Sequence, residues 1–301
     1  MGTPEFAVVP LKSLIENGFD VVAVVTNKDK PVGRKQILTP PPVKVYAESK
    51  GIKVLQYSKI RAEGLNDLIS LNPDLIVTCA FGQILSQEII DTAKLGVYNI
   101  HASLLPKYRG ASPISFAILN GEKETGVTIM KTDVGIDTGE ILLSERVKIE
   151  DEDNLGSLSE KLSALGGKLI LSALKIIETG DFALTKQDES LASYTKMIKK
   201  EDALIDFFGS AENIVNKIRA FDPSPVAYTL LNGEPFKIYC AKAVDQSGNA
   251  GEVLDSGKDL IVACGRGAIS IEKVQKAGGK PMLISDFLRG NRIEKGFKFG
   301  V

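Results

Sequence analysis

The only histidine of this 301-residue chain, His101, lies in the stretch VYNIHASLLPKYRG, two residues after Asn99. An Asn amide can donate hydrogen bonds to an oxyanion, and an imidazole, with an unperturbed pKa of ~6.5, can move a proton near neutral pH. A carboxylate beside the ring would orient it and favour its charged form. The best candidate is Asp137, in the turn DVGIDTGEI, with Asp133 as the nearby alternative.

An amide, an imidazole and a carboxylate, with no evident Ser or Cys nucleophile, predict transfer of an acyl group to an external nucleophile. The protein would then supply only oxyanion stabilisation and proton handling. A lone histidine near the end of a strand is also commonly a structural residue. The residue types alone leave that alternative open.

The first half of the chain alternates strand and helix patterns, which predicts βαβ units with a mostly parallel sheet in an α/β, Rossmann-like domain. The expected strands are 20–26, 73–80 and 96–103, and the expected helices are 43–50, 62–71 and 86–92. Asn99 and His101 would share one face of the third strand, near its carboxyl end. Ligands of doubly wound sheets bind beyond that end.

Two further strands, 125–133 and 139–149, are expected to pair around the turn that carries Asp137. Beyond them, Ser157 and Glu160 form a capping-box pattern ahead of a long amphipathic helix that reaches about residue 178.

The composition of the sequence changes after Gly180. The chain becomes polar and without regular pattern, and from about residue 200 the pattern predicts short strands separated by turns. Evenly spaced short strands are typical of a small barrel or sandwich. We therefore predict a catalytic domain over 1–182, a linker over 183–199 and a C-terminal OB-like β-barrel domain over 200–301.

The run NIHASLLPKYRGASP together with DVGIDTGEI resembles the folate-dependent formyltransferase family. The family's catalytic Asn, His and Asp match Asn99, His101 and Asp137. The resemblance implies that an amine attacks the formyl group of the co-substrate 10-formyltetrahydrofolate. Asn99 would hold the formyl oxygen, and His101 would stabilise the tetrahedral intermediate and relay protons to the folate nitrogen. Asp137 would orient and charge His101, or accept the amine proton through water.

Two stretches resemble the family's folate-contacting segments. AFGQIL, residues 80–85, resembles the stretch whose backbone groups pair with the pterin ring, and SLLP, residues 103–106, resembles a second contact in which Leu105–Pro106 would be a cis bond. The residues that the resemblance assigns to folate are Phe81, Gly82, Gln83, Ile84, Leu85, Ser103, Leu104, Leu105 and Pro106.

Members of this family formylate a purine-precursor amine, amino sugars or the methionine carried by initiator tRNA. The opening MGTPEFAVVPLKSL and the later stretches KKEDALIDF, IRAFDPSPVAY and GFKFGV resemble the members that act on initiator tRNA, over nearly the whole chain. The resemblance therefore implies initiator methionyl-tRNA as the partner and translation initiation as the process. Amino-sugar formylation and a non-catalytic RNA- or folate-binding role are the alternatives.

Basic residues gather in two places that would suit a tRNA backbone. The segment after the 20–26 strand carries Lys28, Lys30, Arg34 and Lys35 against one acidic residue, and its prolines predict a loop rather than a helix. The resemblance implies that this loop enters the acceptor end of the tRNA. Residues 260–301 hold eight basic and three acidic residues. An ordinary solvated surface is the alternative in both places.

The net charge of −1 argues against a uniformly basic nucleic-acid binder, and no apolar run approaches the ~18 residues of a membrane span. The three cysteines lack metal-ligand spacing, so we predict no metal site. We expect a cytoplasmic monomer. Family members carry a strand ahead of the GTPEFA turn with which this sequence starts. We therefore expect a sheet that lacks its central strand and loses stability.

Overall fold

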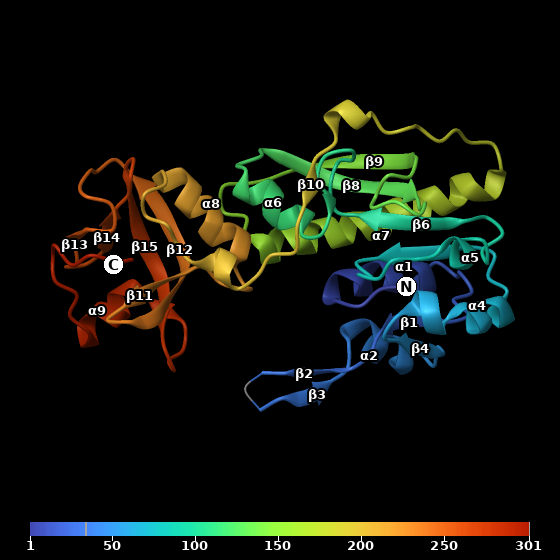
Figure 1. Cartoon of the computed structure of the whole chain (residues 1–301), viewed down its shortest axis with the longest axis horizontal. Coiled ribbons are helices and arrows are strands. Elements are labelled where there is room, and N and C mark those ends of the chain that lie inside the picture. Colours follow the sequence, from blue (N-terminus) through green and yellow to red (C-terminus); the bar gives the residue numbers. More distant parts are fainter. Residues whose placement is uncertain (34, 301) are drawn as a thin grey trace. The chain divides into compact units, whose positions relative to one another are not determined.

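The computed structural model describes residues 1–33 and 35–300, which divide into two compact units (Figure 1). Unit 1 consists of Met1–Pro113, Glu124–Lys148 and Ser159–Lys196. Unit 2 consists of Ile114–Lys123, Ile149–Leu158 and the chain from Met197 onward. Two short segments that precede residue 159 thus belong to unit 2.

The strands of unit 1 are β1 (Val24–Asn27), β2 (Lys30–Val32), β3 (Ile37–Thr39), β4 (Val54–Tyr57), β5 (Ile76–Cys79), β6 (Val97–His101), β7 (Arg109–Gly110), β8 (Glu124–Lys131), β9 (Ile141–Lys148) and β10 (Tyr194–Thr195). β1 pairs in parallel with β4, and β5 with β6. β8 then pairs antiparallel with both β6 and β9. The predicted parallel-sheet domain and the predicted strand pair around residue 137 are confirmed.

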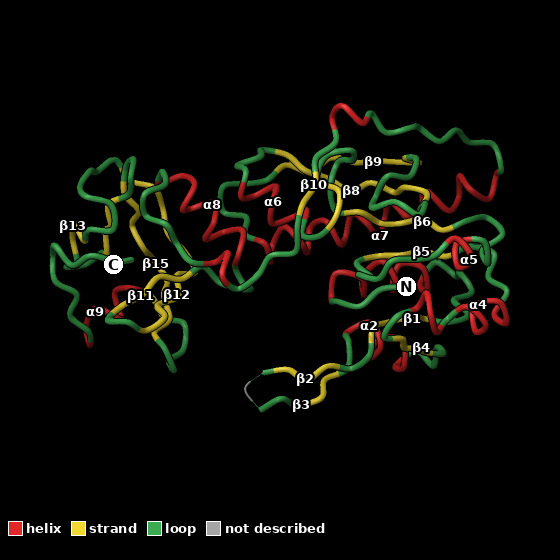
Figure 2. Tube along the Cα trace, in the orientation of Figure 1, coloured by secondary structure: helices red, strands yellow, loops and turns green. Residues whose placement is uncertain are grey.

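Helices connect these strands (Figure 2): η1 (Glu5–Ala7), α1 (Val8–Glu16), α2 (Pro42–Ser49), α3 (Ile60–Glu63), α4 (Leu65–Leu71), α5 (Gln87–Ile90), α6 (Pro113–Leu119), the long α7 (Leu155–Thr179) and η2 (Glu189–Leu191). The predicted helix 62–71 is interrupted at Gly64. Helix α7 starts before Ser157, because the Asn154 side chain accepts the Ser157 N–H (2.9 Å) at the helix start. The predicted cap at Ser157 is therefore wrong.

A slot separates the β1–β4 pair from the sheet that begins with β5, and Met1 and Gly2 occupy one end of it. The Met1 amine donates to Val77 O (2.6 Å), Cys79 N donates to Met1 O (2.9 Å), and Gly2 N donates to Val25 O (3.0 Å). These bonds bridge the two sheets as a parallel strand would.

The rest of the slot is a cavity of about 520 Å³, lined by apolar side chains from 21–25 on one side and 73–77 on the other. The expected gap in the sheet is therefore present. It also explains why β1 is shorter than the predicted strand: residues 20–23 line the slot instead of pairing.

We expect an extension of four or five Val and Ile residues ahead of Met1 to fill this slot as a strand. Burial of each Val or Ile side chain contributes ~1.5–3 kcal/mol of transfer free energy, and the conformational entropy lost on ordering the segment offsets much of this. The net effect should raise the free energy of unfolding by about 3 kcal/mol. Thermal unfolding should shift upward by about 5–10 °C. An extension of equal length made of Asp and Pro is the control, and an equal shift with that control would contradict the prediction.

The same extension should change the pH dependence of stability. Burial in the slot lowers the pKa of the Met1 amine from 8.0 to about 6. The unfolded chain then binds more protons between pH 6 and 8, so stability falls as the pH drops through that window, by about 3 kcal/mol in all. The extension would move the amine out of the slot, so the midpoint of thermal unfolding should depend less on pH between pH 6 and 8.

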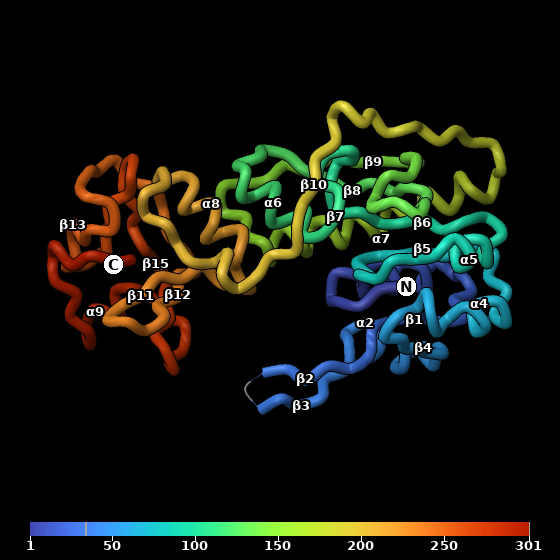
Figure 3. The backbone as a smooth tube through the Cα atoms, viewed as in Figure 1, coloured from blue at the N-terminus to red at the C-terminus, as the bar shows by residue number. Residues whose placement is uncertain are grey.

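Unit 2 holds an antiparallel sheet with strand order β11-β12-β15-β14-β13, curled into a half-barrel (Figure 3). Its elements are η3 (Glu201–Ala203), α8 (Ala211–Phe221), β11 (Tyr228–Leu231), β12 (Glu234–Val244), β13 (Val253–Asp255), β14 (Leu260–Ala263), β15 (Ala268–Lys276), β16 (Met282–Leu283) and α9 (Ile284–Gly290). In its core Phe236 stacks on Phe299 and packs at a tilt against Phe287. Throughout the described chain, no helix is both long and apolar enough to cross a bilayer.

Candidate active site

Strand β6 places Asn99 and His101 on one face at its carboxyl end, as the alternation of side chains predicts. The Asn99 Oδ1 accepts a hydrogen bond from Thr78 Oγ1 (2.9 Å) on the neighbouring strand β5. Because the Asp137 carboxylate can only accept hydrogen bonds, the amide atom that faces it is fixed as the NH₂ group. Asn99 Nδ2 donates to Asp137 Oδ1 (3.3 Å). The pairing of β5 with β6 therefore orients the Asn99 amide so that its NH₂ group faces the Asp137 carboxylate.

Asp137 lies in the turn between β8 and β9 and brings its carboxylate to both residues of β6. Its Oδ2 is 3.6 Å from His101 Nδ1 and accepts a hydrogen bond from Gly110 N (2.8 Å). The residue has φ +53°, a left-handed conformation that costs free energy for a residue with a Cβ. The structure thus gathers the predicted Asn99, His101 and Asp137 into one cluster.

The buried ring of His101 is held on its other side by the backbone, where Nε2 lies 2.9 Å from Tyr108 O. A carbonyl can only accept, so the hydrogen-bond network assigns a proton to Nε2. Nδ1 is the nitrogen that faces Asp137. The ring can therefore accept a proton at Nδ1, which lies 3.6 Å from the Asp137 carboxylate.

Asp133, the alternative carboxylate, performs a different task. It accepts hydrogen bonds from Gly135 N (3.0 Å) and Thr138 Oγ1 (2.8 Å) inside its own turn. These bonds shape the loop that presents Asp137. The geometry favours Asp137 as the partner of the histidine.

Residues 80–85, the first predicted folate segment, leave the end of β5 in a sharp turn in which Ala80 and Gly82 both have positive φ. Within the described chain, the backbone groups of 82–85 take no hydrogen bond from other residues. The Ile84 side chain is 62% exposed, whereas Phe81 and Leu85 are buried in the core. This backbone is available to pair with a flat ring that carries donors and acceptors.

Gln83 is the side chain that fixes this segment. Its Nε2 donates to Asn27 Oδ1 (2.6 Å) and Tyr57 O (3.0 Å), and its Oε1 accepts the Ile60 N–H (2.7 Å). Three of the four hydrogen-bonding positions of the amide are thus used within the protein, and these bonds position the turn.

The second predicted folate segment, 103–106, follows β6 directly and contains the expected cis bond between Leu105 and Pro106. Ser103 is buried and donates through Oγ to Lys107 O (2.6 Å). Thr128 Oγ1 donates to Ser103 O (2.7 Å) and accepts from Leu105 N (3.2 Å). Leu104 and Pro106 are half-buried, so they are the members of this segment that could touch a ligand.

The predicted basic loop is a β-hairpin formed by β2 and β3 rather than an irregular loop. Lys30 and Lys35 are exposed on it. Lys28, just before it, lies 3.6 Å from Glu63. Arg34 lies outside the described residues. All residues of β2 and β3 are exposed, and Pro31 in β2 stands opposite Leu38 in β3.

Three groups that the sequence did not indicate also contact the cluster: the Tyr108 carbonyl, the Gly110 N–H and Gln187. Gln187 Nε2 donates to the backbone oxygens of Asp137 (2.8 Å) and Gly139 (2.7 Å). Two of these groups are backbone atoms, which leave no signal in residue types. Gln187 lies in the segment predicted to be a linker, where a polar residue is expected. Among the described residues, no group of three or more His, Cys, Asp or Glu could hold a metal ion.

The fold and this cluster define a one-carbon transferase. The sequence model of the formyl transferase family matches residues 1–174, and that of the formyl transferase C-terminal domain matches residues 197–292. A solved structure of WlaRD, a sugar 3N-formyl transferase crystallised with dTDP and 5-N-formyl-THF, superposes with a TM-score of 0.68 at 25% identity. That similarity covers 93% of this chain and 97% of the other.

Two curated relatives are closer in sequence. The methionyl-tRNA formyltransferase of Geobacter metallireducens is 47% identical over 100% of this chain and 97% of the relative. The methionyl-tRNA formyltransferase of Bacillus subtilis is 45% identical over 100% of this chain and 96% of the relative. The chain belongs to the methionyl-tRNA formyltransferase family, and its co-substrate is 10-formyltetrahydrofolate.

Proposed function

We propose that Asn99, His101 and Asp137 carry out the transfer of the formyl group from 10-formyltetrahydrofolate to the α-amino group of methionine on initiator tRNA. One observation supports this assignment above all: a single carboxylate, Asp137, spans the amide of Asn99 and the Nδ1 of His101 at the end of β6. The product would serve translation initiation, as the names of the relatives indicate.

The reaction forms a bond between the amine nitrogen and the formyl carbon and breaks the bond between that carbon and folate N10. Negative charge develops on the formyl oxygen, where the Asn99 amide and a protonated His101 would stabilise it. One proton leaves the attacking amine and one must reach N10, and His101 Nδ1 is the group placed to transfer it. Asp137 would orient the ring and stabilise its charged form, or accept the amine proton through water.

We propose that folate lies along the backbone of 82–85 and beside Leu104 and Pro106. The free N–H and C=O groups of the first segment suit the amide-like edge of a pterin. The side chains of Phe81, Gln83, Leu85 and Ser103 would support this site from inside, since each is buried or bonded within the protein. Leu105, also buried, holds the turn through its N–H.

We propose that the hairpin of β2 and β3 contacts the acceptor end of the tRNA through Lys30, Arg34 and Lys35, with Lys28 beside it. Replacing Lys30 and Lys35 together by Glu should raise KM for initiator methionyl-tRNA about tenfold or more. The logarithm of the affinity should also depend less steeply on the logarithm of the salt concentration, by about 1 for each phosphate that the variant no longer neutralises. Lys175→Glu, an exposed lysine on α7, is the matched control. An unchanged KM in the hairpin variant would contradict the role.

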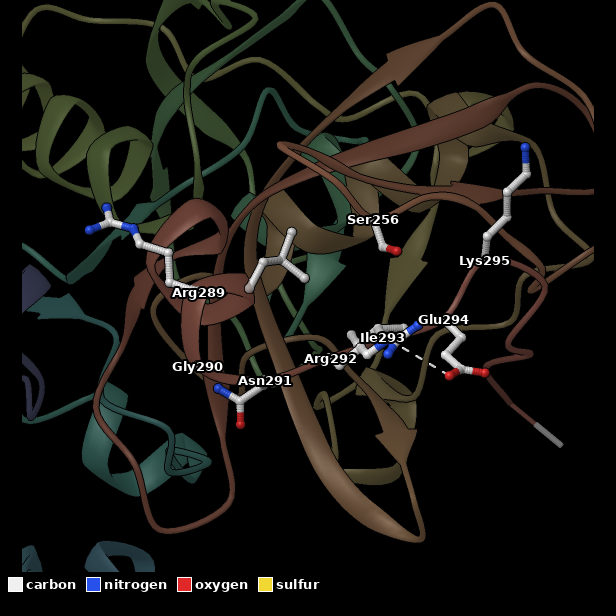
Figure 4. Close-up of a pocket in the computed structure, with 9 residues that line it drawn as sticks. Ser256, Arg289, Gly290, Asn291, Arg292, Ile293, Glu294 and Lys295 are labelled. Carbon is white, nitrogen blue, oxygen red and sulfur yellow. Dashed lines mark ion pairs between the residues drawn. The ribbon is translucent and has the colours of Figure 1, made fainter.

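For the C-terminal unit we propose an OB-like tRNA-binding domain over 200–301, joined by the linker 183–199 to the catalytic domain 1–182. In support, the segment 289–295 borders an open cavity of about 750 Å³. Figure 4 shows Arg289 and Lys295 projecting from this segment, and Arg292 pairing with Glu294. Such a basic rim suits a nucleic-acid backbone. We further propose that the enzyme acts as a monomer in the cytoplasm, where initiator tRNA is charged.

The experiment that tests the proposal presents the purified chain with 10-formyltetrahydrofolate and two acceptors in parallel. Initiator methionyl-tRNA is one, and a nucleotide-linked amino sugar is the other, because the sugar enzyme has a similar fold. We expect formylmethionyl-tRNA and no formylated sugar. Formylation of the sugar alone would replace the proposed substrate. Binding of folate and tRNA without turnover would support a binding protein instead.

A further inference from the structure

The segment 185–195, which we call the strap, contacts the turn that carries Asp137. The strap and the cluster of Asn99, His101 and Asp137 both lie within unit 1. Thr185 pairs with Ile141 through two backbone hydrogen bonds (2.8 and 2.9 Å), and β10 pairs in parallel with β7. The strap is therefore an ordered part of the sheet periphery, although its composition predicts an irregular linker.

The strap is anchored to a buried cation. The side chain of Arg109 has no exposed surface, and its guanidinium makes a two-bond pair with Glu189 (2.7 and 2.8 Å). It also donates to Gln187 Oε1 from Nε (3.0 Å) and Nη2 (2.8 Å), and to Tyr194 OH (3.0 Å). A bidentate pair with a rigid fork fixes the direction of both partners. Arg109 also holds the pKa of Glu189 below its usual range through this hydrogen bond.

Gln187 connects that anchor to the Asp137 turn. Arg109 can only donate, so Gln187 Oε1 must face it, and the NH₂ group must face the other way. The two amide hydrogens go to Asp137 O (2.8 Å) and Gly139 O (2.7 Å). All four hydrogen-bonding positions of the amide are therefore used. Gln187 therefore connects the buried Arg109 to the backbone of Asp137, which has a positive φ.

The residues on either side of Arg109 touch the same cluster. Tyr108 O contacts His101 Nε2 (2.9 Å), and Gly110 N donates to Asp137 Oδ2 (2.8 Å). The strap holds this peptide closely: a Cβ on Gly110 would lie 2.6 Å from Thr195 O. Tyr108 thus holds the imidazole through its Nε2. Gly110 holds the Asp137 carboxylate, and Gln187 holds the Asp137 backbone.

We propose that Gln187, held by Arg109 and Glu189, is a positioning residue that fixes the Asp137 carboxylate against His101 and Asn99. The inference rests on the proposed function and deepens it, because it assigns part of the linker to the active site. Gln187 acts through the Asp137 backbone and touches no substrate. A loosened turn would let the carboxylate drift, and displacements near 1 Å can cost about 10²-fold in rate.

The test compares wild-type enzyme with Gln187→Leu, which keeps the side-chain bulk without the amide, and with Gln187→Asn, whose shorter amide cannot span Arg109 and both carbonyls. Formyl transfer from 10-formyltetrahydrofolate to initiator methionyl-tRNA is measured at saturation of each substrate. We expect kcat to fall about tenfold or more, with both KM values within about twofold of wild type. Ser190→Ala, which removes a strap hydrogen bond to Asp188 away from the cluster, should leave kcat unchanged.

A double-mutant cycle separates positioning from a general structural effect. Each Gln187 substitution is repeated in an Asp137→Asn background, where the carboxylate to be positioned is absent. We expect the tenfold loss to shrink below about twofold there. An equal loss in both backgrounds, a loss shared by Ser190→Ala, or failure of both variants to fold at the assay temperature would overturn the proposal. Wild-type turnover tests the proposed function separately, so the two failures are distinguishable.

Discussion

Replacement of His101 by Ala is expected to lower kcat for formyl transfer by about 10³-fold, because a positioned acid–base group contributes roughly 10²–10⁴-fold. No other described side chain next to Asn99 and Asp137 can transfer a proton near neutral pH. Binding of 10-formyltetrahydrofolate and of tRNA should change by less than about threefold, since neither proposed site uses the imidazole. Single-turnover kinetics with separate binding titrations would measure both quantities.

The variant also offers an internal control. Removing the ring leaves space beside Tyr108 O and Asp137, so added imidazole should restore part of the activity by taking the same place. Loss of folate and tRNA binding together with turnover would show that His101 supports the fold. In that case the catalytic assignment would be wrong.

Replacement of Asp137 by Asn is the second large effect that we expect, a decrease in kcat of about 10²-fold or more. The substitution keeps the size of the side chain but removes the charge that would stabilise the imidazolium. It also leaves one oxygen where two now accept hydrogen bonds, from Asn99 Nδ2 and from Gly110 N. The amide nitrogen of Asn would face one of these donors, which costs a hydrogen bond in addition to the charge.

Asp133→Asn is the matched control, since it makes the same chemical change four residues away in the same turn. Among the described residues its carboxylate accepts hydrogen bonds from Gly135 and Thr138 alone, so we expect a change in kcat of threefold or less. Steady-state kinetics of the two variants side by side would decide between the two carboxylates. A larger loss in the Asp133 variant would reverse the assignment.

Local pattern predicted much of the architecture correctly. Short apolar, β-branched runs marked β5 and β6. The hairpin of β2 and β3 was not predicted as strands, because its residues are exposed and carry no buried face to create an alternating pattern. The full barrel expected for the second domain is a half-barrel, because closure depends on how far a sheet curls, which strand patterns do not encode.

Residue types and their spacing were enough to indicate the groups that could perform the chemistry: one histidine, an asparagine two positions earlier and a carboxylate in a glycine-flanked turn. The sequence already favoured Asp137 over Asp133, whereas the support that Gln187 and Arg109 give to Asp137 became evident only in the folded chain. The cause is separation along the sequence. The bonds from Asn99 to Asp137 and from Gln187 to Asp137 join residues 38 and 50 positions apart, and such contacts exist only after the strands have paired.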